Sequence, residues 1–152
     1  MPTRPTREPK ACTNFRLRQL TRRVTQLYDA ELGKAGLKTT QYALLSHVLK
    51  LGPARPGDLA RAMTMDASTL TRNLKPLLDA GWVEVSAGPD ARSRSITITA
   101  AGRARRDAAR GDWQRAQKAL EARLGPARVD ALHALIDESL ALLDATPEGD
   151  TE

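Results

Sequence analysis

The stretch from Asp58 to Gly102 constrains the fold more than any other part of the chain. It begins with a short amphipathic segment, continues after a turn with a second one, and ends in two short segments of alternating apolar residues. Apolar residues three and four positions apart indicate helices, whereas alternation with a period of two indicates strands. The predicted order is therefore helix, turn, helix and hairpin.

The second of these helices has two chemically distinct faces. Asp66 precedes it and is expected to cap it, because a carboxylate oxygen accepts the free amides of a first helical turn. Its apolar residues share one side, at Leu70, Leu74, Leu77 and Leu78. Polar side chains that can contact bases or phosphates lie elsewhere on its surface, at Ser68, Thr69, Arg72, Asn73 and Lys75. A helix of this kind fits the major groove of B-form DNA, where arginine can hold guanine with two hydrogen bonds and lysine suits phosphate.

The predicted hairpin carries two arginines close to its turn. Its apolar residues alternate on both sides of Gly88-Pro89-Asp90, which predicts one buried face. Arg92 lies at the expected tip with Arg94 beside it, where an arginine can enter the minor groove. Asp90 is expected to hold the loop by an ion pair or a turn-capping hydrogen bond. In isolation both arginines would be ordinary solvated loop residues, but the basic helix before them favours a winged helix-turn-helix that reads DNA.

Long helices are expected to flank this unit. We predict a disordered arm over residues 1–12, a folded domain over residues 13–145 and a flexible tail over residues 146–152. Within the domain, the winged unit spans about 39–100, with dimerisation helices at about 14–34 and 100–144. The fold class is then mainly α with a small β-hairpin. Thr39 or Thr40 is expected to cap the helix after the first, and Thr99 the helix after the hairpin.

The first and last helices give an independent reason to expect a dimer. Both carry long apolar stripes that one small winged domain cannot cover. Charge is unevenly distributed as well. Residues 1–50 carry ten Lys or Arg and three Asp or Glu, residues 53–106 carry nine and five, and residues 107–152 carry five and ten. The basic part suits a polyanion, although charge alone does not distinguish a nucleic acid from solvent as its partner.

The helix and the hairpin together resemble the MarR family of bacterial transcriptional regulators. The resemblance rests on Asp58-Leu-Ala-Arg, on Asp66-Ala-Ser-Thr-Leu-Thr-Arg72, on Leu-Asp-Ala-Gly81-Trp-Val and on Asp90-Ala-Arg-Ser-Arg-Ser-Ile-Thr-Ile-Thr-Ala-Ala-Gly102. It covers roughly residues 14–143 and implies a homodimer whose first and last helices interlock. Two winged units would then meet a pseudo-palindromic operator in double-stranded DNA. Arg92 would enter the minor groove, and Ser68, Thr69 and Arg72 would read the major groove.

The resemblance also implies a switch. Small aromatic or phenolic anions would bind between the dimer helices and the winged unit, in a pocket lined by Tyr28, Tyr42, His47 and Trp113, although each of these also suits a plain core position. Some members of the family sense oxidants through a cysteine near the first helix. Cys12 precedes that helix close to cations, and it is either an oxidisable thiol or an inert one.

Other classes of protein find less support. No apolar run approaches the roughly 20 residues that span a bilayer, so we expect a cytoplasmic protein. One cysteine and two histidines give no zinc spacing, and we expect no metal and no cofactor. The chain shows no phosphate-binding glycine loop and no nucleophile elbow, which argues against an enzyme. We expect a sequence-specific regulator of transcription, a repressor released by a small ligand or an oxidant. The alternative is a winged-helix module that binds proteins and not DNA.

Overall fold

The computed structural model describes residues 11–90 and 92–145, so the predicted tail and nearly all of the predicted arm lie outside the described residues. The elements in chain order are α1 (Thr13–Leu32), the 3-10 turn η1 (Gly33–Ala35), α2 (Thr39–Leu51), α3 (Pro56–Ala62), α4 (Ala67–Asp79), β1 (Val83–Ala87), β2 (Arg94–Ile98), α5 (Ala100–Leu124) and α6 (Pro126–Asp144). The expected fold class, mainly helical with one hairpin, is confirmed.

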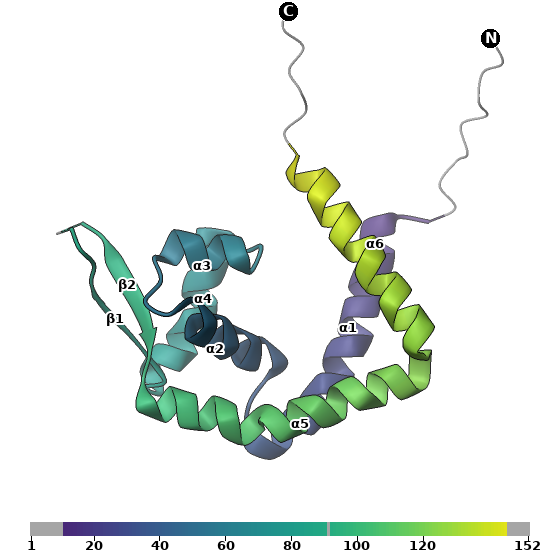
Figure 1. Cartoon of the computed structure of the whole chain (residues 1–152), viewed down its shortest axis with the longest axis horizontal. Helices are drawn as coiled ribbons and strands as arrows, with labels where there is room; N and C mark the ends of the chain where they lie inside the picture. The colour runs from purple at the N-terminus through teal and green to yellow at the C-terminus, as the bar shows by residue number, and fades with distance from the viewer. Residues whose placement is uncertain (1–10, 91, 146–152) are drawn as a thin grey trace, which may run out of the picture.

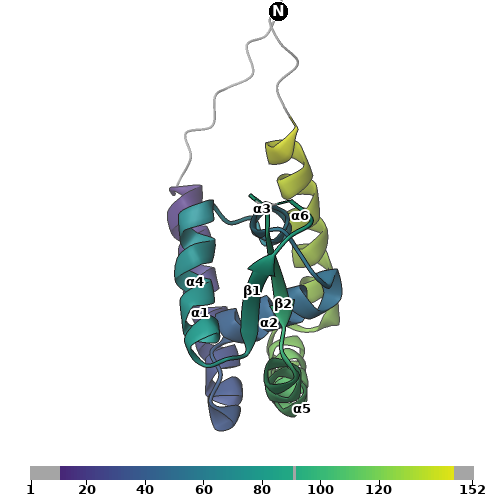
Figure 2. The ribbon, with the colours of Figure 1, turned by 90° about the vertical axis from the view of Figure 1, so that its left-hand side faces the viewer.

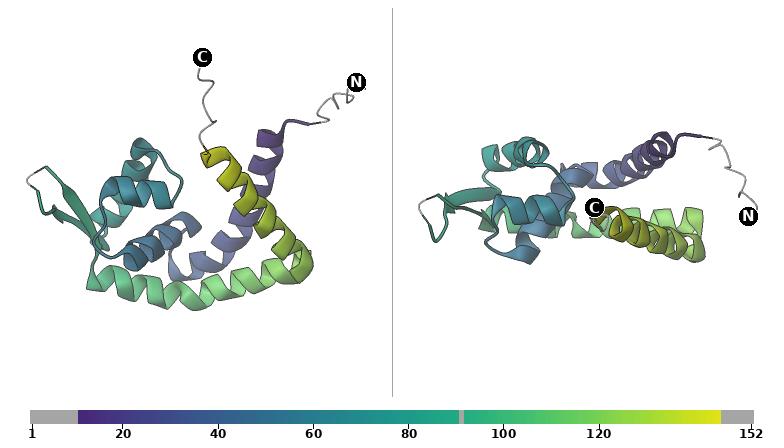
Figure 3. Two further views of the ribbon diagram at one scale, coloured as in Figure 1. Left: turned by 45° about the horizontal axis from the view of Figure 1, so that its top comes forward. Right: turned by 90° about the horizontal axis from the view of Figure 1, so that it is seen from above.

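The long helix α5 joins the two parts of the molecule (Figure 1). At one end, α2, α3, α4 and the β1–β2 hairpin form the winged unit. At the other end α6 folds back from α5, while α1 packs along α5. Although α1 and α6 overlap in the view of Figure 1, Figures 2 and 3 show that they lie apart. One chain therefore presents these two helices without packing them against each other.

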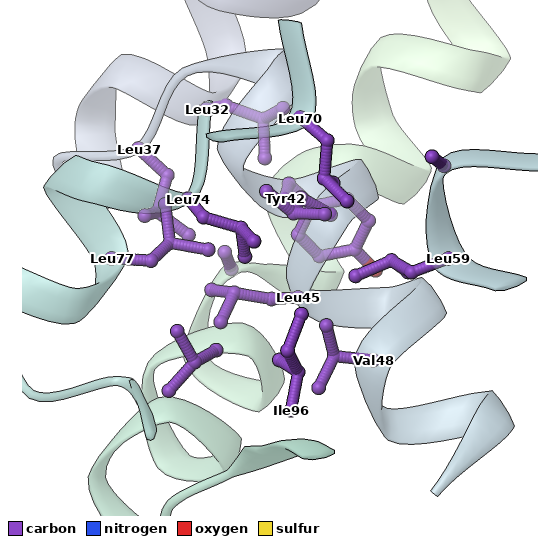
Figure 4. Close-up of a cluster of buried hydrophobic side chains, with 14 residues drawn as sticks. Leu32, Leu37, Tyr42, Leu45, Val48, Leu59, Leu70, Leu74, Leu77 and Ile96 are labelled. Atoms are coloured by element: carbon purple, nitrogen blue, oxygen red, sulfur yellow. The ribbon is translucent and has the colours of Figure 1, made fainter. Parts of the chain in front are cut away.

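The hydrophobic core fills the winged unit (Figure 4). Leucines of α2, α3 and α4 meet Ile96 of the hairpin there, and Leu32 and Leu37 extend the cluster to the end of α1. The largest fully buried side chains are Leu32, Leu44, Leu45, Val48, Leu59, Leu70, Leu77 and Ile96. Burying one leucine contributes about 1.5–3 kcal/mol. This core therefore holds α4 and the hairpin in a fixed position on α2.

Two of the predicted helix caps are present. The Oδ1 atom of Asp66 accepts the Thr69 amide at 2.7 Å at the start of α4. The hydroxyl of Thr99 accepts the Gly102 amide at 3.0 Å at the start of α5. Each bond satisfies an amide that has no partner within its own helix.

The start of α2 differs from the prediction that a threonine caps it. Lys38 takes the cap position, and its amide donates to the side-chain oxygen of Gln41 at 3.0 Å. Thr39 donates both its amide and its hydroxyl to the Asp29 carboxylate of α1, at 2.7 and 2.6 Å. A long-range partner on α1 thus replaces the expected local one, and Thr39 ties α1 to α2.

The apolar face of the hairpin is only partly buried. Val83 pairs with Ile98 and Val85 with Ile96, so all four share one face. Val83 is buried, whereas Val85 is 40% exposed, contrary to the expected buried face. Leu78 of α4, also expected in the core, is 38% exposed. Both residues line a hollow of about 200 Å³ between α3, α4 and the hairpin, which leaves these two side chains partly open to solvent.

The far end of the molecule exposes many large apolar side chains. Of α6, only Val129 is buried. The exposed large apolar residues of α1 and α6 are Phe15, Leu17, Leu20, Leu135, Ile136, Leu140, Leu142 and Leu143. Leu143 alone leaves 82% of its surface in water. Large apolar side chains exposed in this number mark an interaction site. None of the described helices has the length and apolar character needed to cross a membrane.

Candidate nucleic-acid interface

The polar side chains predicted on α4 differ in their exposure and in the partners that they already have. Arg72 is exposed, and it forms no ion pair among the described residues. Lys75 is also exposed, but its ammonium group lies 3.1 Å from the Asp79 carboxylate. Asn73 is half-buried and donates to the sulfur of Met65 at 3.8 Å. Arg72 is therefore the strongest candidate on α4 for a contact with DNA.

Asp66 organises the first turn of this helix. Besides capping Thr69, its carboxylate accepts the Ser68 hydroxyl at 2.8 Å. The hydrogen bond from the Thr69 amide, supported by the one from Ser68, lowers the pKa of Asp66 from 3.8 to about 2. The carboxylate is thus charged at neutral pH, and it holds the two hydroxyl residues at the exposed end of α4.

Ser93 holds the loop of the wing. Its hydroxyl accepts the Asp90 amide and donates to the Asp90 carbonyl, both at 3.1 Å, and its amide donates to the same carbonyl at 3.0 Å. The Ser93 carbonyl accepts the Gly88 amide at 2.8 Å, and a Cβ at Gly88 would collide with the Ser93 side chain. Ser93 was not among the residues predicted for the wing, although a serine three residues after the Asp of a Gly-Pro-Asp turn is a sequence signal for such a bond.

Asp90 holds the loop through its main chain, whereas an ion pair or hydrogen bond of its side chain was expected. Within residues 11–90 and 92–145 its carboxylate has no hydrogen bond and no ion pair. Arg92 lies in the exposed loop, whereas Arg94 is the first residue of β2, paired with Ala87. Both arginines are exposed, and neither has an acidic partner in the described part of the chain.

The base of the wing is locked to α5. The Thr99 hydroxyl donates to the Gly81 carbonyl at 2.6 Å, and its amide donates to the Trp82 carbonyl at 3.0 Å. A Cβ at Gly102 would collide with that same Trp82 carbonyl. The guanidinium of Arg105 lies over the Trp82 ring, 5.3 Å from its centroid. The wing consequently has a fixed position on α5, the helix that leads to the far end of the molecule.

Three of the four predicted pocket residues lie together between α2 and α5. Tyr42, His47 and Trp113 line a hollow of about 350 Å³ together with Arg106 and Arg110. The rings of Tyr42 and Trp113 stack with their centroids 6.0 Å apart. The Arg106 guanidinium lies 5.6 Å from the Tyr42 ring centroid. The hollow thus combines aromatic surface with two cations.

His47 lines this hollow, whereas Tyr28 does not. The Nδ1 atom of His47 lies 2.8 Å from the Ala43 carbonyl, which can only accept, so Nδ1 carries the proton. Tyr28 does not line the hollow, contrary to expectation. It is buried between α1 and α5, where its hydroxyl donates to Gln117. Burial, followed by the charge of Glu121, raises the pKa of Tyr28.

Cys12 is exposed at the cap position of α1 and makes no capping hydrogen bond with its side chain. The described residues contain no group of three or more His, Cys, Asp or Glu side chains placed to hold a metal ion.

A helix pair and an arginine-bearing hairpin on one core define a winged helix-turn-helix protein, and comparisons with known proteins agree. A model of the MarR family matches residues 37–93. The solved structure of the M. tuberculosis transcriptional regulator MOSR in complex with DNA is 32% identical, with a TM-score of 0.76, over 89% of this chain and 100% of that one.

Two further relatives extend the comparison. An E. coli MarR variant complexed with operator DNA shares the fold, with a TM-score of 0.76 and 22% identity over 84% of this chain and 92% of that one. The HTH-type transcriptional regulator YwoH of Bacillus subtilis is 26% identical over 83 residues, which are 55% of this chain and 61% of that relative's length. The chain therefore belongs to the MarR family, a family of DNA-binding transcriptional regulators.

Proposed function

We propose that this protein is a homodimeric repressor that binds a pseudo-palindromic operator in double-stranded DNA. The observation that carries the proposal is that one fold presents Arg72 on α4 and Arg92 on the wing. Both side chains are exposed and free of acidic partners within the described residues, and one core holds both elements. A helix and an adjacent arginine so placed match a major groove and the minor groove beside it. The proposal needs no catalytic step and no cofactor.

Each predicted DNA contact has its own role in this proposal. Arg72 pairs with a base, while Ser68 and Thr69 donate to phosphates or bases at the start of α4. Arg92 enters the minor groove and Arg94 binds the backbone beside it. Lys75 must exchange its ion pair with Asp79 for a phosphate, and Asn73 must leave Met65, so both contribute less.

The dimer follows from the exposed apolar surface of α1 and α6. Two copies that interlock these helices remove side chains such as Phe15 and Leu143 from water. A two-fold dimer presents two winged units in opposite directions, which requires a pseudo-palindromic site. A repressor of this kind works on the chromosome, which places it in the cytoplasm of a bacterium.

Binding of the purified full chain to selected genomic fragments, followed by fluorescence anisotropy, tests this function. We expect dimers in sedimentation, tight binding at low salt and a steep fall in affinity with added salt. Arg92→Ala should weaken operator binding while the protein remains dimeric. A monomer, or a chain that ignores duplex DNA even in dilute buffer, contradicts the proposal and favours the protein-interaction alternative.

The ligand that releases the protein from its operator would bind in the hollow between α2 and α5. A small aromatic carboxylate there can stack beside Trp113 and pair with Arg110, which is exposed and has no ion pair among the described residues. The chain has two tryptophans, so Trp82→Phe leaves Trp113 as the only one. Titration of that variant with benzoate should change its fluorescence, and Arg110→Ala should weaken the effect.

An oxidant acting on Cys12 is the second candidate signal, because this thiol is exposed. Peroxide should release wild-type protein from DNA and leave Cys12→Ser bound. Equal release of both proteins contradicts a role for Cys12.

A further inference from the structure

Arg55 occupies a position where its residue type serves no local purpose. It is the cap residue of α3, where Ser, Thr, Asp or Asn would bond a free amide, and its side chain makes no capping hydrogen bond. The side chain is exposed. No ion pair of Arg55 occurs among the residues that the structure describes. Helix capping and local charge pairing therefore do not account for an arginine here.

The fold places Arg55 next to the wing, although the two are far apart in sequence. The preceding residue, Ala54, pairs with Ile96 of β2 through two main-chain hydrogen bonds of 3.0 and 2.8 Å. This short ladder seats the start of α3 against the hairpin, as the views in Figures 1 and 3 show. A hollow of about 300 Å³ results, lined by Arg55, Pro56, Arg92, Ser93 and Arg94.

The charges around this hollow are unbalanced. Two other exposed cations of the winged unit do have acidic neighbours, since Arg61 lies 3.2 Å from Asp58 and Lys75 lies 3.1 Å from Asp79. Arg55, Arg92 and Arg94 have none within the described part of the chain. Guanidinium groups gathered without a counter-charge repel one another and attract an anion, and their planar donors match phosphate oxygens.

We propose that Arg55 and Arg94 form a phosphate clasp that holds one backbone strand of duplex DNA, beside the groove-binding Arg92. The inference rests on the proposed function and adds to it a contact from α3 that lies outside α4 and the wing. Phosphate contacts position a protein on the duplex without reading sequence. Arg55 thus contributes affinity to every duplex, and it fixes the strand beside the groove that Arg92 enters.

The salt dependence of binding separates this role from a general surface charge. Each phosphate contact contributes about 0.9 to the slope of log affinity against log salt, so Arg55→Ala should lower the slope by about 1.8 in a dimer. When salt rises from 50 to 200 mM, Arg55→Ala should therefore lose about tenfold less affinity than the wild type loses. The reduction should be the same on operator and on random duplex.

Two variants serve as matched controls. Arg61→Ala removes an exposed arginine of the same helix that has an acidic partner, and its slope should stay close to the wild-type value. Arg55→Lys keeps the charge and should restore most of the slope. Thermal melting of Arg55→Ala should match the wild type, because within the described residues the side chain makes no capping hydrogen bond and no ion pair.

The outcomes distinguish the clasp from the proposed function. A wild-type protein that fails to bind DNA contradicts the proposed function itself. A wild-type protein that binds its operator, with an unchanged slope in Arg55→Ala, overturns only the clasp. An equal fall of the slope in Arg55→Ala and Arg61→Ala also overturns it, because the effect would then belong to net charge.

Discussion

The hydroxyl of Thr99 donates to the carbonyl of Gly81 at 2.6 Å, across the junction between the end of α4 and the start of α5. The Thr99 hydroxyl oxygen also accepts the Gly102 amide at 3.0 Å. One side chain thus caps α5 and ties it to the turn that leads into β1. The base of the wing depends on this bond.

Thr99→Val, which keeps the shape of the side chain and removes its hydroxyl, should destabilise the protein by about 1–3 kcal/mol, because the cap and a second hydrogen bond are lost together. Thr99→Ser should retain most of the stability. Urea unfolding followed by circular dichroism measures both. Equal stability of Thr99→Val and the wild type would contradict the structural role of this hydroxyl.

Two glycines of α5 should respond in opposite directions to alanine. At Gly102 a Cβ would collide with the Trp82 carbonyl, so Gly102→Ala should cost about 1–3 kcal/mol as an overpacked site does. At Gly111 the nearest atom is an Arg115 side-chain nitrogen at 3.6 Å, so Gly111→Ala should stabilise the helix by about 0.5–1 kcal/mol. Thermal melting measures the stability of both variants relative to the wild type. A change of the same sign in both would contradict the prediction.

The stability contributed by Asp66 should depend on pH in the acid range. Its hydrogen bonds lower the folded-state pKa from 3.8 to about 2. A group with a depressed pKa stabilises the folded state above its unfolded pKa and loses that effect as pH falls through the folded value. The contribution should thus be complete above about pH 4 and decline toward pH 2.

Asp66→Asn provides the control for this pH dependence, because asparagine also caps helices but does not titrate. The difference in melting temperature between the wild type and this variant should be constant from pH 7 to about 4 and should shift against the wild type below that. A difference that stays constant to pH 2 would show that the carboxylate charge is irrelevant.

Arg72→Ala should weaken operator binding by about 1–3 kcal/mol if the guanidinium pairs with a base. Lys75→Ala should cost less, because Lys75 must first leave Asp79. Anisotropy titrations with operator and random duplexes measure both variants. A loss in Arg72→Ala that is equal on the two duplexes would identify a phosphate contact and reject base reading.

Features that depend on neighbouring residues were predictable from the sequence. The caps at Asp66 and Thr99 were predicted correctly, because a cap bonds an amide three residues away. Thr39 was misassigned because its partner, Asp29, belongs to another helix. Val85 and Leu78 were misassigned because periodicity shows which face a side chain shares, but not how far the core extends along that face.

The candidate site divides in the same way. The pattern of residues placed Arg72 on the helix and Arg92 in the loop. It did not separate Tyr28 from Tyr42, since both lie on apolar helix faces and only packing puts one against Gln117 and the other beside Trp113. It also offered no reason to single out Arg55, which lies more than thirty residues before Arg92.

The sequence by itself determined the order of the helices, the hairpin and the two faces of α4, because these depend on periodicity and on bonds between near neighbours. Only the tertiary structure decided that Arg55 meets the wing. It also decided that α1 and α6 lie apart with their apolar surfaces exposed. Those relationships depend on how distant segments pack, and local residue preferences do not encode that geometry.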